Sequence, residues 1–124
     1  MVVREWSEHE VDRVFQALAD STRRDIVARV LESEQSVSAL AARYEMSFAA
    51  VQKHVAVLER ARLVSKRRSG RSQLVRGEVV PLRTAARLLG DYEQVWHDRI
   101  DRIADLLAED EAPPSEDRSR GSAT

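Results

Sequence analysis

Apolar residues recur three or four positions apart along most of this chain, which is the spacing of one face of an α-helix. Four helices are predicted before residue 62. The first covers residues 8–18, and the second is capped by Asp20 or Ser21 and buries Ile26, Val27, Val30 and Leu31. The third covers residues 39–44 and is capped by Ser38, and the fourth opens at Ser47. Residues 63–67 and 72–76 then alternate weakly, as the strands of a hairpin do. The pattern predicts a mainly α fold with a small β-hairpin (α+β).

The helix that opens at Ser47 has two contrasting faces. Its apolar stripe is expected to comprise Phe48, Val51, Val55 and Leu58. The opposite face holds only small residues and hydrogen-bond donors: Ala49, Lys53, Ala56 and Arg60, with Gln52 on its flank. Small residues permit close approach to a groove, glutamine can pair with a base edge, and Lys or Arg can meet phosphate or guanine. This face predicts a helix in the DNA major groove, although a plain solvated helix has the same spacing.

Charge is distributed very unevenly along the chain. Residues 46–77 contain eight Lys or Arg and one acid, a net charge of +7, whereas the whole chain carries −1. A positive cluster on one module is typical of binding to a phosphate backbone. Arg67, Arg68 and Arg71 lie in and next to the hairpin tip and are expected to project toward the DNA backbone or minor groove. A solvated charge run and an anionic-membrane patch are the alternatives.

A helical apolar pattern resumes after Pro81 and continues to about Glu109. Its later positions are Leu89, Tyr92, Trp96, Ile100, Ile103, Leu106 and Leu107. A body this small cannot bury so long a seam, which favours a homodimer, and two-fold symmetry would match a palindromic operator. Packing within one chain is the alternative. The pattern does not decide whether Gly90 breaks the helix or bends it.

The 124 residues fit one domain over residues 8–109, with an N-terminal tail (1–7) and a Pro-, Ser- and acid-rich tail (110–124) that is predicted to be disordered. The absence of Cys excludes disulfides and thiolate metal sites. The three histidines are isolated in the sequence, whereas zinc needs about four converging ligands. We expect no metal, no cofactor, no membrane segment, no enzymatic activity and a cytoplasmic location, since no signal peptide, phosphate-cradling loop or nucleophile motif is visible.

Several stretches in this order resemble the ArsR-type winged helix-turn-helix transcriptional repressors. They are residues 18–24 (LADSTRR), 37–41 (VSALA) and 46–59 (MSFAAVQKHVAVLE), followed by Leu63-Val64 and Gly70-Arg71. The segment from Pro81 to Ala86, with Tyr92 and Trp96, is similar to the branch often linked to genes for lipid-binding-like (SRPBCC) proteins. The resemblance covers about residues 8–109.

The resemblance implies a repressor that occludes a promoter, as a homodimer built from the first and last helices. The recognition-helix candidates are Ser47, Phe48, Ala49, Gln52, Lys53 and His54, and those of the hairpin, or wing, are Arg68 and Arg71. The charge pattern adds Arg60 and Arg67. The dimer candidates are Trp6, Val11, Phe15, Leu89, Tyr92, Trp96, Ile100, Ile103 and Leu107. His54 could equally be a core or phosphate-contacting histidine.

Several positions depart from the family pattern, among them Arg62 and Gln52. Arg62 stands where the family usually ends its recognition helix with Gly, and a left-handed conformation there would cost about 1 kcal/mol. Gln52 replaces a more usual Ser, so an operator sequence cannot be transferred, and an inducer is not revealed. A winged-helix module that binds a protein and little DNA is the alternative function.

Overall fold

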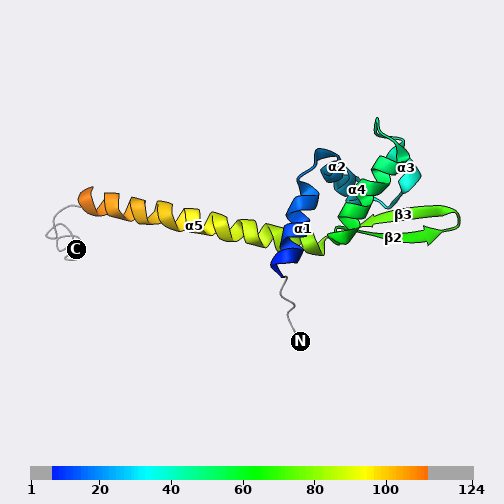
Figure 1. The fold of residues 1–124 in the computed structure, drawn as a ribbon. Coiled ribbons are helices and arrows are strands. Elements are labelled where there is room, and N and C mark those ends of the chain that lie inside the picture. Colours follow the sequence, from blue (N-terminus) through cyan, green and yellow to red (C-terminus); the bar gives the residue numbers. More distant parts are fainter. Residues whose placement is uncertain (1–6, 112–124) are drawn as a thin grey trace, which may run out of the picture. The chain divides into compact units, whose positions relative to one another are not determined.

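A computed structural model describes residues 7–111 of the chain. The elements are α1 (Glu8–Leu18), α2 (Ser21–Glu32), β1 (Gln35–Ser36), α3 (Val37–Ala41), α4 (Phe48–Arg60), β2 (Val64–Ser69), β3 (Ser72–Gly77) and α5 (Val80–Glu111) (Figure 1). The chain divides into two units, and the boundary falls inside α5, between Leu88 and Leu89.

Side-chain caps fix where the first four helices begin. Ser7 and Glu10 form a reciprocal capping box at α1, with Ser7 Oγ accepting from the Glu10 N–H at 3.2 Å. Asp20, Ser36 and Ser47 each accept a backbone N–H of the following turn, at 3.0–3.1 Å. Such a cap stabilises a helix by about 1 kcal/mol. The predicted bounds of α1 and the predicted cap at Ser47 are confirmed.

The third helix was predicted in the wrong place. It begins at Val37 with Ser36 as its cap and ends at Ala41, not over residues 39–44 behind Ser38. Ser36 has extended backbone angles because it also belongs to β1, and this leaves its hydroxyl pointing at the free N–H groups of the first turn. Residues 42–46 form the turn that leads into α4.

The hairpin is part of a three-stranded antiparallel sheet in the order β1-β3-β2. β2 and β3 pair from Val64↔Gly77 to Ser69↔Ser72, and Gly70 turns the chain with a φ of 60°. β1 adds the pairs Gln35↔Val75 and Ser36↔Leu74. The polar segment before α3 gave no sign of this strand, because two residues are too few for an alternating pattern.

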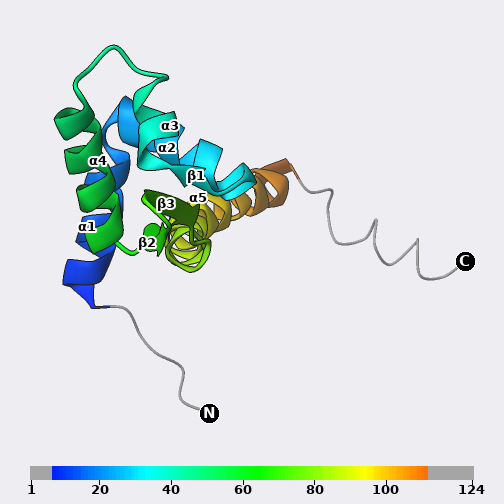
Figure 2. The same ribbon diagram turned by 90° about the vertical axis from the view of Figure 1, so that its right-hand side faces the viewer.

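The core of the first unit lies between the helices and the inner face of the sheet. α4 packs on α1, α2 and α3 (Figure 2). The largest fully buried side chains are Ile26, Leu40, Leu58, Leu63, Val14, Val51, Val55, Val64 and Val75. Phe48 and Leu31 were predicted to be buried and are not, since 46% and 42% of their surfaces are exposed. Phe48 is the first residue of α4 and extends beyond the end of the core.

In the second unit, α5 continues through Gly90 without a break and reaches Glu111. Its large apolar side chains are 41–67% exposed: Leu89, Tyr92, Val95, Trp96, Ile100, Ile103, Leu106 and Leu107. The predicted disordered tail lies outside the described residues from position 112 onward.

Candidate nucleic-acid interface

The outer face of α4 presents cations that no acid within residues 7–111 neutralises. Lys53, Gln52 and Ala49 are exposed, as is Arg60 in the last turn. Within residues 7–111, neither Lys53 nor Arg60 has a carboxylate at ion-pair distance. Ala56, predicted on the same face, is half-buried. The exposed part of this face thus combines a small side chain with positive charge, and it can bind an external anion.

The wing, from Val64 to Gly77, carries five cations, of which three have acidic partners among the described residues. Lys66 Nζ lies 3.4 Å from Glu59, and Arg76 lies 3.7 Å from Glu78. Arg67 donates two hydrogen bonds of 2.9 Å to Glu34, in the loop before β1. The guanidinium of Arg67 lowers the pKa of Glu34, chiefly through these hydrogen bonds.

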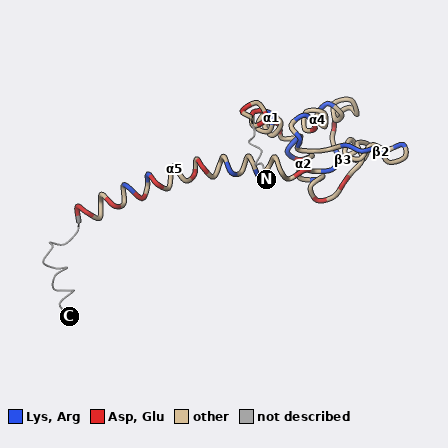
Figure 3. The backbone as a smooth tube through the Cα atoms, turned by 90° about the horizontal axis from the view of Figure 1, so that it is seen from below, with Lys and Arg blue, Asp and Glu red and all other residues tan. Residues whose placement is uncertain are grey.

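Arg68 and Arg71, at the tip, are left without such partners among the described residues. Figure 3 shows the Lys and Arg positions running along the hairpin. Arg67 differs from these two because Glu34 already holds its guanidinium. Of the three predicted wing contacts, Arg68 and Arg71 are thus the two with no acidic partner among the described residues, and all three stay predictions.

The recognition helix and the wing tip face a common hollow of about 240 Å³, here called the wing hollow. Its lining residues are Val37, Ser38, Phe48, Gln52, Arg68, Arg71, Ser72 and Gln73. The predicted helix contacts Phe48 and Gln52 thus share one surface with the predicted wing contacts Arg68 and Arg71. An apolar ring, two amides and two guanidinium groups line it.

His54, in contrast, is turned toward α2. Its Nδ1 lies 3.3 Å from Nη1 of Arg23 and 3.9 Å from the Asp20 carboxylate. Arg23 also donates to the carbonyls of Ala17 (2.7 Å) and Gln16 (3.1 Å) at the end of α1. The hydrogen bond that the Arg23 backbone N–H donates to the Asp20 carboxylate is the main cause of the lowered pKa of Asp20. His54 thus joins α4 to the α1–α2 corner, and its place among the groove-facing residues stays a prediction.

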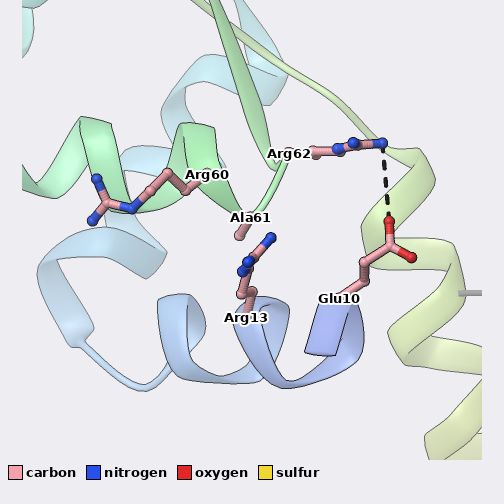
Figure 4. Close-up of a pocket in the computed structure, with 5 residues that line it drawn as sticks. All are labelled: Glu10, Arg13, Arg60, Ala61 and Arg62. Atoms are coloured by element: carbon pink, nitrogen blue, oxygen red, sulfur yellow. Dashed lines mark ion pairs between the residues drawn. The ribbon is translucent and has the colours of Figure 1, made fainter. Parts of the chain in front are cut away.

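A second hollow lies at α1, α2 and α4, and we call it the α1 hollow. It measures about 280 Å³ and is lined by Arg13, Gln16, Arg23, Val57 and Arg60. A smaller depression beside it is lined by Glu10, Arg13, Arg60, Ala61 and Arg62 (Figure 4), where Arg62 lies 3.9 Å from Glu10. Arg13 was not singled out in the sequence, because α1 was interpreted only through its apolar stripe.

The predicted dimer residues are divided between the two units. Val11 and Phe15 on α1 are half-buried, and Phe15 packs against the core of the first unit. Leu89, Tyr92, Trp96, Ile100, Ile103 and Leu107 all lie on the exposed apolar face of α5. Trp6 lies outside the described residues.

Between residues 7 and 111, no three His, Asp or Glu side chains are grouped so that they could hold a metal ion. No helix in that range is both long and apolar enough to cross a bilayer.

A short helix, a turn, a helix with a cationic outer face and an adjoining hairpin define a winged helix-turn-helix protein. Residues 20–66 match the family described as bacterial regulatory protein, arsR family. The HTH-type transcriptional regulator Rv2034 of Mycobacterium tuberculosis is 36% identical over 96 residues, which cover 77% of this chain and 87% of that protein. The chain belongs to the ArsR family, and it is a transcriptional regulator with a winged helix-turn-helix DNA-binding domain.

Solved structures have the same fold. An ArsR-like transcriptional regulator from Rhodococcus sp. RHA1 matches with a TM-score of 0.68 and 33% identity, over 79% of this chain and 92% of the other. The homodimeric winged helix-turn-helix domain of Mb0332 from Mycobacterium bovis matches with a TM-score of 0.57 and 24% identity, over 74% and 92% of the two chains.

Proposed function

We propose that this protein is a homodimeric repressor of the bacterial cytoplasm that binds a specific palindromic operator and so blocks a promoter. The observation that carries the proposal is the wing hollow, where Phe48 and Gln52 of the recognition helix meet Arg68 and Arg71 of the wing. Groove-facing and backbone-facing groups are brought to one surface there, next to the exposed cation Lys53.

Each of these side chains has a distinct role in the proposal. Gln52 and Lys53 contact base edges, because an amide can pair with adenine and an ammonium with guanine. Phe48 is an exposed aromatic ring that can lie against a thymine methyl, and Ala49 leaves room for the groove edge. Arg68 and Arg71 bind phosphates, which position the protein without selecting a sequence.

The apolar face of α5 supports the homodimer. Eight large apolar side chains exposed along one helix are far more than a monomeric helix leaves in water. The domain of Mb0332, which has this fold, is homodimeric. A second copy of the chain would cover the face and would place two recognition helices in two half-sites, about 34–36 Å apart on one side of the DNA.

The proposal is tested by selecting bound duplexes from a random pool with purified protein, followed by titration of the selected duplex at several salt concentrations. We expect a palindromic sequence, a steep salt dependence, and binding at least about 10³-fold tighter than to random duplex. A shallow salt dependence with no preferred sequence would favour a module that binds a protein partner instead.

The groove face is tested with Gln52→Ala and Lys53→Ala, alone and together. Each lost base contact should reduce discrimination by about 1–3 kcal/mol while the dimer persists. Arg83→Ala serves as the matched control, since Arg83 is exposed on the first turns of α5 and lines neither hollow. Unchanged operator affinity in the double variant would refute the assigned face.

A further inference from the structure

The α1 hollow is lined by more positive charge than the described residues around it neutralise. Arg13, Arg23 and Arg60 line it, and Arg62 lies in the adjoining depression. Arg62 has the Glu10 carboxylate at 3.9 Å, and Arg23 is held by carbonyls and His54. Arg13 and Arg60 form no ion pair or hydrogen bond with any side chain between residues 7 and 111. The N–H donors of these two guanidinium groups are therefore not used by side chains of the described residues.

The hollow lies on the other flank of the recognition helix from the wing hollow. At about 100° per residue, Gln52 and Val57 project from α4 about 140° apart. Gln52 faces the wing hollow, and Val57 faces the α1 hollow. Lys53 projects between them, on the exposed outer face. A basic hollow therefore flanks the groove-facing surface on each side.

This arrangement fits the dimensions of B-form DNA. The major groove is about 12 Å wide, and a helix with its side chains is about 10–12 Å across. A recognition helix lying in the groove therefore brings one phosphate backbone close to each of its flanks. In that position the wing arginines would face one strand, and the arginines of the α1 hollow would face the other.

We propose that the α1 hollow is a phosphate-binding site, in which Arg13 and Arg60 grip phosphate oxygens and Arg23 adds a fixed positive charge. Guanidinium groups suit this task because their planar donors match phosphate oxygens in pairs. Gln16 adds an amide donor at the rim. The DNA backbone opposite the wing is the first source of the phosphate, which rests on the proposed function. A phosphorylated small molecule presents the same oxygens and is the second source.

The first experiment compares the salt dependence of duplex binding by wild type, Arg13→Ala, Arg13→Lys and the matched control Arg83→Ala. Losing one phosphate contact should reduce the slope of log affinity against log salt by about 0.9. Between 50 and 200 mM salt, the wild type should then lose about 3.5-fold more affinity than Arg13→Ala. Arg13→Lys and Arg83→Ala should keep the wild-type slope, and the preference for operator over random duplex should not change.

Neutral phosphate analogues locate the contact. Single operator phosphates are replaced, one at a time, with methylphosphonates. At one phosphate per half-site, the replacement should weaken operator binding by the wild type but leave binding by Arg13→Ala unchanged. That phosphate should lie on the strand opposite the one protected by Arg71. Thermal unfolding checks that Arg13→Ala is folded, which is expected because Arg13 is exposed.

The second experiment uses inorganic phosphate without DNA. The Nε–Hε signals of Arg13 and Arg60 are followed by NMR as phosphate replaces chloride at constant ionic strength. Suppose that phosphate causes saturable shifts while Arg13→Ala keeps the wild-type slope of log affinity against log salt. This result would support the site, with a small phosphorylated ligand as the source of the phosphate. An unchanged slope together with no saturable shift would overturn the proposal.

The two proposals fail differently. If the wild type binds no duplex at all, the proposed function is wrong, and the NMR experiment still decides whether the hollow binds phosphate. If the wild type binds its operator while Arg13→Ala and Arg83→Ala behave alike and phosphate gives no shift, only the inference about the α1 hollow is wrong.

Discussion

Gly77 is the position where one added methyl group should do the most damage to the wing. It ends β3 opposite Val64, and it lies directly under Leu31 of α2. A Cβ atom at this position would stand 2.8 Å from Leu31 Cδ2 and 3.0 Å from Leu31 Cα. Rotating the Leu31 side chain can relieve the first contact but not the second, because Cα belongs to the backbone.

The size of the effect follows from two opposing terms. Forcing a methyl group into a packed site costs about 1–3 kcal/mol. Replacing Gly with Ala also stiffens the unfolded chain, which returns about 0.4–1 kcal/mol. We therefore expect Gly77→Ala to lower the free energy of unfolding by about 1–2 kcal/mol, and to weaken DNA binding because the base of the wing must shift away from α2.

Urea denaturation measures the change, with Gly90→Ala as the matched control. Gly90 lies inside α5, and a Cβ there meets nothing within 4 Å. The control should gain about 0.5–1 kcal/mol, the usual advantage of Ala over Gly in a helix. Adding Leu31→Ala to Gly77→Ala should recover only part of the loss. Equal stability of wild type and Gly77→Ala would refute the reasoning.

Three further predictions concern single side chains. Tyr44→Phe removes the hydroxyl that donates to Asp25 (2.5 Å) and is the main cause of the lowered pKa of Asp25. It should cost about 0.5–1 kcal/mol at pH 7 in urea titrations, since the pair is partly exposed, and the cost should shrink as the pH falls below about 4 and Asp25 becomes protonated. Arg62 has a φ of 63°, so Arg62→Gly should raise the free energy of unfolding by up to about 1 kcal/mol, and the melting temperature with it. A lower melting temperature would mean that the ion pair of Arg62 with Glu10 outweighs the backbone strain. Trp96→Glu should yield monomers in light scattering, and an intact dimer would remove Trp96 from the interface.

Much of the DNA-binding module could be predicted from local sequence. The bounds of α1 follow from its apolar stripe and from the acidic residues of its first turn, and the left-handed turn at Arg62 follows from its place in the family pattern. The Ser47 cap likewise marks the start of the recognition helix. Each of these features is determined by residues within about one helical turn of it.

The features that were missed depend on contacts between distant parts of the chain. Glu34 and Arg67 are 33 residues apart, and nothing near either one indicates the pair. His54 is held by Arg23, 31 residues earlier, although helical spacing alone left its orientation open. Arg13 became notable only once α1 was placed beside the end of α4.

The spacing of the apolar residues on α5 determines how two copies of this helix can pair. From Leu89 through Tyr92, Trp96, Ile100 and Ile103 to Leu107 the steps average about 3.6 residues, the natural repeat of a straight helix. A stripe with this repeat runs parallel to the helix axis, whereas a 3.5-residue repeat would wind around it. The positions are also nearly mirrored about Asp98, so antiparallel copies would set Leu89 against Leu107 and Trp96 against Ile100. Every such contact would then occur twice, and a single substitution would loosen the pair on both sides of Asp98.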